Sequence, residues 1–208
     1  LRPMQISLSD SGKRFNREWI FRNLNYQFIA GKSYAITGPN GSGKSTLLQV
    51  IAGSIAASEG TITYQLGGKM IEPEKVFRQV SIAAPYEEVV EEMTLTEFLE
   101  FHRKFKPLLD GFRVPEIIDS VGLSGASAKQ IRYFSSGMKQ RVKLAQAFFS
   151  DTPCLLLDEP CTNLDFEGIA MYQRLVNDFA ANRLVLVSSN DPQEYGFCQE
   201  QLSILAFK

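Results

Sequence analysis

Residues 38–46 read GPNGSGKST, a stretch rich in glycine and hydroxyl side chains with one lysine. The spacing fits the phosphate-binding pattern G-x-x-x-x-G-K-[ST], with Gly38 first, Gly43 and Lys44 at the centre, and Ser45 as the hydroxyl. Glycines let successive backbone N–H groups turn toward an anion, and a helix beginning near Ser45 adds the positive end of its dipole. Lys44 would reach the β- and γ-phosphates, and the Ser45 hydroxyl suits Mg²⁺.

The alternative for this stretch is a glycine-rich turn without a ligand. It is disfavoured because an apolar strand pattern precedes the motif and a helical pattern follows it, as phosphate binding requires. We therefore expect the following residues to bind a nucleoside triphosphate: Gly38, Pro39, Asn40, Gly41, Ser42, Gly43, Lys44, Ser45 and Thr46.

Two carboxylates follow the apolar run CLLL, at Asp158 and Glu159. Parallel α/β sheets bind ligands at the carboxyl ends of their strands, so both groups are expected at the ligand edge. Asp158 is suited to the Mg²⁺ shell opposite Ser45, and Glu159 to polarising a water that attacks a γ-phosphorus. The alternative is a strand end that is polar because it meets solvent.

The elements that position these groups are read from hydrophobic periodicity. Residues 4–10, 19–29 and 33–37 carry strand patterns, and residues 59–71 indicate a hairpin around Gly67 and Gly68. With a further strand in residues 79–85, the N-terminal part predicts a small antiparallel layer beside a nucleotide-binding strand. The runs CLLL and LVLV, separated by a helical pattern, indicate a parallel sheet buried on both faces, and QLSILAF predicts a last strand.

Helical spacing dominates from about Pro85 to Ser150. Within it, Thr94 to Glu97 predicts a capping box. We expect one α/β domain over residues 1–208, with a core at about 1–84 and 151–208 and a helical subdomain at about 85–150. The length of 208 residues and the 44% hydrophobic content allow one substantial core.

Charge and composition exclude several classes. The net charge of −1 argues against a nucleic-acid partner, and no apolar run has the length of a membrane span. Three cysteines without paired C-x-x-C spacing, and no secretory pattern at the start, predict reduced packing thiols in the cytoplasm. The single histidine, His102, excludes a multi-histidine metal site, and we expect it to be solvated on a helix.

The stretch FSSGM places Ser135, Ser136 and Gly137 at the start of a predicted helix. Such a start could bind a second anion, but on its own ordinary capping explains it better.

The ordered motifs GPNGSGKST, FSSGM, CLLLDEP and TNLD resemble the ATP-binding cassette (ABC) ATPase family over essentially the whole chain. The resemblance implies an α/β P-loop NTPase fold with a RecA-like core of mainly parallel sheet, an antiparallel β-layer and a helical subdomain. It implies ATP and Mg²⁺ as ligands. FSSGM resembles the family's signature motif, so Ser135, Ser136 and Gly137 would face the γ-phosphate of ATP bound to a second subunit. Asp165, ending TNLD, would lie in the D-loop across the same interface.

Phe15 lies where family members place an aromatic residue that stacks on adenine, and Trp19 is close enough to leave that assignment open.

Two positions depart from the family pattern. Asn190 stands where a histidine usually holds the γ-phosphate and the attacking water, and asparagine carries no positive charge, so we expect slow hydrolysis. Pro85 or Tyr86 replaces a glutamine that senses Mg²⁺ and faces the membrane partner.

The resemblance implies the ATPase subunit of a membrane transporter, lying on the inner face of the cell membrane. It would work as a dimer with ATP between its subunits and would need a separate permease, because the chain carries no span of its own. Two alternatives stay open: a soluble ABC ATPase of an assembly or repair complex, and a module that binds ATP and hydrolyses it slowly. A basic partner helix at the acidic residues Glu87, Glu88, Glu91 and Glu92 is also conceivable, but a solvated face explains them better.

Overall fold

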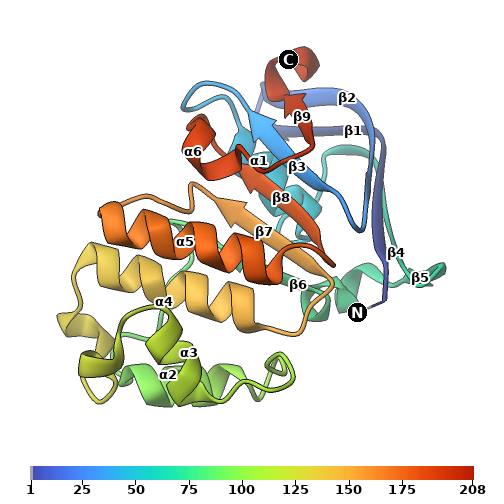
Figure 1. Cartoon of the computed structure of the whole chain (residues 1–208). Coiled ribbons are helices and arrows are strands. Elements are labelled where there is room, and N and C mark those ends of the chain that lie inside the picture. The colour runs from blue at the N-terminus through green and yellow to red at the C-terminus, as the bar shows by residue number, and fades with distance from the viewer. Residues whose placement is uncertain (1) are drawn as a thin grey trace.

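The computed structural model describes residues 2–208, and within them the chain forms two sheets and a set of helices (Figure 1). The antiparallel sheet has the strand order β2-β1-β4-β5, and the parallel sheet has the order β6-β7-β8-β3-β9. The antiparallel strands are β1 Met4–Phe15, β2 Glu18–Ile29, β4 Glu59–Leu66 and β5 Lys69–Ile71. The parallel strands are β3 Ser33–Thr37, β6 Val80–Ala83, β7 Cys154–Asp158, β8 Leu184–Ser188 and β9 Glu200–Ser203.

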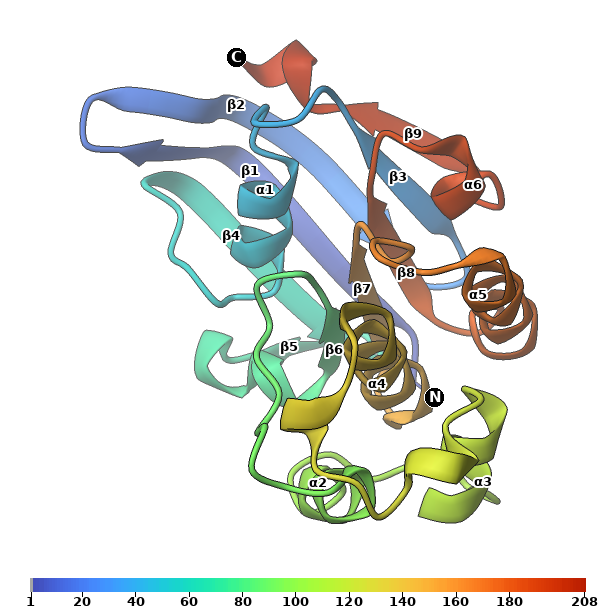
Figure 2. The same ribbon diagram turned by 90° about the vertical axis from the view of Figure 1, so that its left-hand side faces the viewer.

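The helices fall into two groups by where they pack. Helix α1 lies between the two sheets, whereas α4 and α5 run side by side on the other face of the parallel sheet, with α2 and α3 beyond α4 (Figures 1 and 2). Their bounds are α1 Lys44–Ile51, α2 Leu95–His102, α3 Val114–Ser120, α4 Ser136–Phe149, α5 Phe166–Phe179 and α6 Pro192–Tyr195. Short 3-10 turns span Pro73–Arg78, Ser124–Ala126, Ile131–Tyr133 and Ile204–Phe207.

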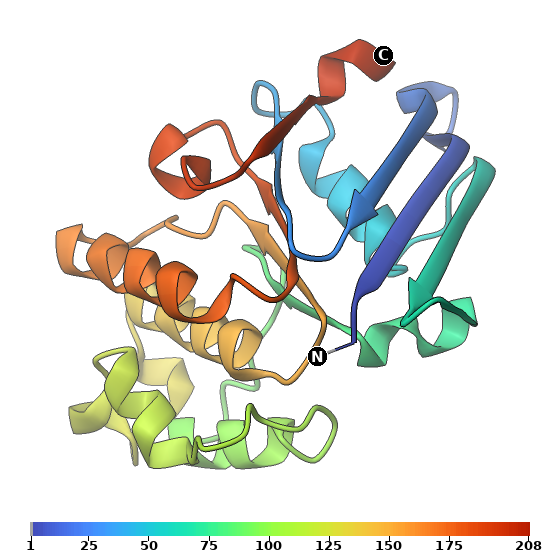
Figure 3. The ribbon, with the colours of Figure 1, turned by 45° about the vertical axis from the view of Figure 1, so that its right-hand side comes forward.

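The alternation of strand side chains explains the layers. In β7, Leu155 and Leu157 join the apolar cluster under α4 and α5, whereas Cys154 and Leu156 join the cluster shared with α1 and the antiparallel sheet. Successive strand residues point to opposite faces, so the unbroken apolar run is explained by helices on one face and a second sheet on the other. Figure 3 shows the antiparallel sheet on one side of the parallel sheet and helices α4 and α5 on the other. The fold class predicted from the sequence is confirmed.

Two local expectations differ from the structure, and a third is confirmed. Residues 80–83 pair with β7 in the parallel sheet and do not join the antiparallel layer. The last strand ends at Ser203, because residues 204–207 form a 3-10 turn. The expected capping box of α2 is present, since Thr94 accepts from the Glu97 N–H and Glu97 accepts from the Thr94 N–H.

His102 is not solvated, and that prediction was wrong. It ends α2, and its Nε2 lies 2.8 Å from the Ser150 hydroxyl, which itself donates to the Gln146 carbonyl. Burial, assisted by the nearby Lys106 ammonium, lowers the pKa of His102 to about 4. The ring is therefore a neutral contact between α2 and the end of α4.

The cysteines are free thiols, as predicted. Cys154 is buried, and Cys161 and Cys198 are partly buried against the cluster under α5. In residues 2–208 no helix has the length and apolar character that crossing a bilayer requires.

Candidate functional site

Three neighbouring strands bring the predicted phosphate-binding residues to one edge of the parallel sheet. In the register of the parallel sheet, Ser188 of β8 pairs with Asp158 of β7 on one side and with Ile36 of β3 on the other. The strands therefore end level with one another. The segments that follow them, which begin at Gly38, Glu159 and Ser189, meet at the same edge, where parallel sheets bind ligands.

The loop 38–43 is shaped to turn its backbone toward an anion. Gly41 and Gly43 have φ angles of 77° and 101°, in the region that favours glycine, and Gly43 caps α1. The first N–H groups of α1 have no partner within the helix and face the loop. Ser42 Oγ is buried without a hydrogen-bond partner, which is costly unless a ligand supplies one.

Lys44 is a buried cation whose partners are neutral. Its side chain begins α1, the residue is 4% exposed, and Nζ donates to the carbonyls of Gly38 at 2.9 Å and Pro39 at 3.3 Å. A buried ammonium is costly without a compensating negative charge. The arrangement favours an anion in the glycine loop.

Asp158 carries the clearest unsatisfied groups of the site. The residue is 1% exposed, and both of its carboxylate oxygens are buried without a hydrogen-bond partner. Burial raises the pKa of Asp158, and the hydroxyls of Ser188 and Ser45 lie near enough to oppose that rise. Orphaned carboxylate oxygens beside the Ser45 hydroxyl are the hard oxygen donors that Mg²⁺ prefers, so the residues present fit this ion.

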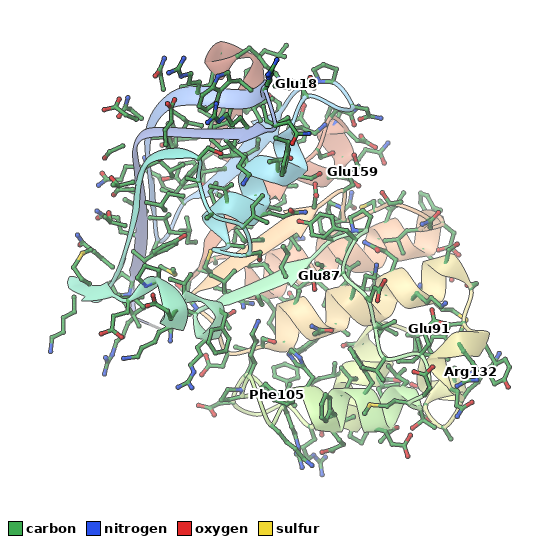
Figure 4. All side chains as sticks on the ribbon, turned by 180° about the vertical axis from the view of Figure 1, so that it is seen from behind. Glu18, Glu87, Glu91, Phe105, Arg132 and Glu159 are labelled. Atoms are coloured by element: carbon green, nitrogen blue, oxygen red, sulfur yellow. The ribbon has the colours of Figure 1, made fainter. Side chains whose placement is uncertain are left out.

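Glu159 leaves the strand in an unusual conformation. Its φ of 43° lies in the left-handed region, where a residue other than glycine is strained, and its N–H donates to the Ser188 carbonyl at 2.9 Å. Figure 4 labels Glu159 where the chain leaves the end of β7. Nearby, Asn190 Nδ2 donates to Asn40 Oδ1 at 3.3 Å, so the loop after β8 touches the glycine loop.

The end of the β1–β2 hairpin lies against the glycine loop and carries both candidate aromatics. Ile20 packs so closely that a Cβ on Gly43 would lie 2.2 Å from its Cγ2. Phe15 is 50% exposed, with the Lys13 ammonium 5.0 Å from its ring centroid. Trp19 has the Arg14 and Arg22 guanidinium groups at 5.5 and 4.5 Å from its ring. Phe15 is the freer of the two.

The residues that resemble the family's signature motif, 135–137, lie at the start of α4 and apart from the glycine loop. Helix α4 begins at Ser136, as predicted, and the Ser135 hydroxyl caps it by accepting from the Met138 N–H at 3.2 Å. Ser135, Ser136, Gly137 and Asp165 line a cavity of about 510 Å³ in which no residue of the stretch 38–46 takes part. The structure thus brings the predicted residues together in two groups, not one.

The loop at residues 84–86, which lacks the expected glutamine, is hydrogen-bonded to α4. Lys143 Nζ donates to the carbonyls of Ala84 at 3.1 Å and Pro85 at 2.9 Å. Tyr86 is 39% exposed, and burial together with the nearby Asp158 carboxylate raises its pKa. Tyr86 therefore faces the phosphate-binding edge, whereas Pro85 offers that edge no side-chain donor.

The acidic run beyond this loop is partly neutralised. Glu91 pairs with Lys139 and Glu92 with Arg132, which Figure 4 shows near the start of α4 and apart from Glu159. These exposed pairs are consistent with the expected solvated face, and the ion pairing was not predicted.

Sequence reasoning missed residues of α4 that hold the loop after β7. Gln140 Nε2 donates to the Pro160 carbonyl at 2.8 Å, and Arg141 Nη2 donates to Asp165 Oδ1 at 2.9 Å. No sequence signal pairs these positions, because their contacts depend on how α4 and the loop pack.

Comparison with known proteins agrees with the geometry. The family model described as ABC transporter matches residues 21–162. The cytochrome c biogenesis ATP-binding export protein CcmA of Rhodopseudomonas palustris (strain BisB5) is 33% identical over 176 residues, which are 83% of this chain and 85% of that protein. The lantibiotic transport ATP-binding protein SrtF of Streptococcus pyogenes is 26% identical over 190 residues, with 89% and 79% covered.

Solved structures share the fold. The structure of an ATP binding subunit of an ABC transporter superposes with a TM-score of 0.82 at 25% identity, covering 95% of this chain and 85% of that one. A bacterial Atm1-family ABC exporter with ATP bound gives a TM-score of 0.79 at 20% identity, covering 98% of this chain and 37% of that one, and is similar in fold.

Proposed function

The chain belongs to the ABC transporter family as an ATP-binding protein, and from this membership we propose that it hydrolyses ATP to power a membrane-embedded permease. The observation that carries the proposal is the phosphate-binding edge, where the buried Lys44 ammonium and the orphaned Asp158 oxygens flank a glycine loop. Without a ligand, the buried ammonium and the unpartnered carboxylate oxygens cost free energy. A metal-bound polyphosphate would give both of them partners.

The residues of this edge have separate roles in the proposal. Backbone N–H groups of the glycine loop and of the first turn of α1 hold the phosphates, and Lys44 neutralises the transferred group. Ser45 and Asp158 hold Mg²⁺, which when bound neutralises charge on the β- and γ-phosphates. Glu159 accepts a proton from the attacking water, in line with the γ-phosphorus.

Asn190 completes the water site through its amide. It can donate a hydrogen bond to the phosphate or the water, but it remains neutral at every pH. We propose slower turnover than a histidine would support. This neutral amide is also the observation that favours a second candidate function, an ATP-binding module that hydrolyses rarely.

The second group of residues acts in the partner subunit's site. Alone, the phosphate edge leaves the γ-phosphate open to solvent, and the N-terminal end of α4 from another chain would add fixed donors there. We propose that two chains close around two ATP molecules, with Ser135, Ser136 and Gly137 facing the γ-phosphate and Asp165 lying at the interface. Phe15 would stack on the adenine, because Trp19 is already occupied by two guanidinium groups.

Two further features belong to the proposal. Helices α2 and α3, within residues 85–150, form the helical subdomain that faces the permease. The chain binds that permease from the cytoplasm, at the inner face of the cell membrane. One relative named above, CcmA, is called an export protein, which favours an exporter for this chain.

Two measurements test the function together. ATP turnover of the purified chain is expected to require Mg²⁺ and to vanish in Glu159→Gln, which excludes a contaminating ATPase. A tagged chain from gently solubilised membranes is expected to bring down a multi-span protein in equal amount by mass spectrometry. Recovery with soluble companions alone would contradict the transporter and favour the assembly complex.

A further inference from the structure

The loop after β7 lies along the first half of α4 and touches it at several points. A Cβ on Gly137 would lie 2.7 Å from the Asn163 carbonyl oxygen, so the helix start and the loop backbone are in direct contact. One turn later, the buried Gln140 donates to the Pro160 carbonyl. Asn163 itself has a φ of 64°, a strained conformation that its surroundings must maintain.

Arg141 of α4 forms hydrogen bonds to the end of α3 and to the residue that caps α5. Its side chain is only 16% exposed, and Nη1 donates to the carbonyl of Val121, the C-cap of α3, at 3.3 Å. Nη2 donates to Asp165 Oδ1, which also accepts from the Gly168 N–H at 2.8 Å and thereby caps α5. The guanidinium therefore fixes the mutual position of α4, α3 and the start of α5.

The Asp165 carboxylate is held and not free. The Gly168 N–H and the Arg141 guanidinium lower its pKa, although its side chain is 70% exposed. An exposed ion pair contributes little to overall stability. The Arg141–Asp165 pair instead fixes the relative orientation of its two side chains, because both have defined hydrogen-bond geometry.

We propose that Arg141 is a positioning residue that locks the start of α4 and the loop 160–165 into one unit, presented whole to the ATP of the other subunit. The inference rests on the proposed dimer, because in a single chain no ATP lies against this unit. Arg141 touches neither the glycine loop nor Asp158. Its loss should therefore spare ATP binding to the same chain and damage the site of its partner.

Mixing of two defective variants tests the direction of action. Lys44→Ala disables a chain's own phosphate site, and Arg141→Gln is expected to lower turnover by about tenfold or more, because small misplacements of donors are costly in catalysis. An equimolar mixture should recover up to about a quarter of wild-type turnover, since half of the dimers are mixed and each has one intact composite site. No recovery would mean that Arg141 acts within its own chain or only in folding.

Control mixtures separate this inference from the dimer itself. Lys44→Ala mixed with Ser135→Arg should also recover turnover, and if this pair fails the proposed dimer is wrong, whatever Arg141 does. Arg141→Gln mixed with Asp165→Ala should recover nothing, because both lesions lie in the same unit. Recovery in that pair would overturn the proposal.

A matched variant and a second readout guard against loss of folding. Arg132→Gln removes another ion-paired arginine of the same region, paired with Glu92 at 3.6 Å, and should leave turnover unchanged. In Arg141→Gln without nucleotide, amide hydrogen exchange should rise over residues 160–165 while residues 38–46 keep wild-type rates. Equal rises in both segments, or none in either, would contradict the positioning role. Arg141→Lys, which keeps the charge but not the forked geometry, should retain part of the defect.

Discussion

The phosphate-binding edge and the start of α4 handle their polar groups in opposite ways. At the edge, Ser42 Oγ and the Asp158 oxygens are buried without partners, and Lys44 is held only by carbonyls. At α4, the Ser135 hydroxyl caps the helix, and the Asp165 carboxylate caps α5 and pairs with Arg141. In the first region, side-chain atoms are left without partners and are available to a ligand. In the second region, the side chains are hydrogen-bonded within the protein and hold the helix starts in place.

In the proposed dimer, this difference explains why each region needs the other. Unsatisfied buried groups gain most from a ligand that arrives in the same chain. A helix start whose side chains are already engaged offers only its N–H groups and its dipole, which act on an anion brought from outside. In the proposed dimer, the first region would be a receptor for metal-bound phosphate, and the second would be a donor surface for a phosphate held by another chain.

Lys44→Ala should have the largest effect and should be confined to the first region. Removal of the buried ammonium is expected to lower turnover by about a thousandfold, in the range of other lost charge contacts to transferring phosphate. Isothermal titration should show ATP binding greatly weakened. Lys75→Ala, which removes an exposed lysine paired with Glu72, is the control and should behave as wild type. Normal ATP affinity in Lys44→Ala would break the distinction.

Gly137→Ala should damage only the second region. The new Cβ would lie 2.7 Å from the Asn163 carbonyl oxygen and must push the helix and loop apart, which we expect to lower turnover by about a hundredfold. ATP affinity of the single chain should not change. Gly125→Ala, whose Cβ would meet nothing within 4 Å, is the matched control. An equal loss of ATP binding in Gly137→Ala would show that the two regions are not independent.

How far the sequence predicts these regions follows from how local each one is. The phosphate edge is specified by a contiguous motif and by strand ends, so spacing alone predicts that Lys44, Ser45 and Asp158 lie at one edge of the sheet, where the structure has them. The bracing of α4 joins residues that are distant in sequence, and nothing in the sequence pairs Arg141 with Asp165. The left-handed turn at Glu159 is equally hidden, because its conformation depends on the loop and not on its residue type.

His102→Gln should change stability with pH and leave both regions intact. The folded pKa of about 4 lies below the ordinary value of 6.5, so between these values the unfolded chain takes up a proton that the folded chain refuses. Wild-type stability should fall as the pH drops through this window, with about 2 kcal/mol lost from this group by pH 5. Urea unfolding at pH 7 and pH 5 measures the loss, which His102→Gln should lack. The same pH dependence in the variant would contradict a buried neutral ring.

Asn190→His should produce the smallest effect, a gain. A histidine beside the glycine loop can carry positive charge toward the phosphate, so we expect turnover to rise several-fold, on the order of 1 kcal/mol in the barrier. The gain should shrink above about pH 7, as the imidazole loses its proton. Steady-state rates from pH 6 to pH 8 check this, with Asn190→Ala as the variant expected to be slower than wild type. A histidine variant no faster than wild type would place the rate limit elsewhere.

The most direct test of the two-region account is the mass of Glu159→Gln in solution with saturating ATP and Mg²⁺, measured by light scattering after size exclusion. Without hydrolysis, ATP should remain between the receptor edge of one chain and the donor surface of the other. The account predicts a dimer that requires ATP and reverts to monomer when Ser135→Arg is added. A chain that stays monomeric in saturating ATP would contradict it.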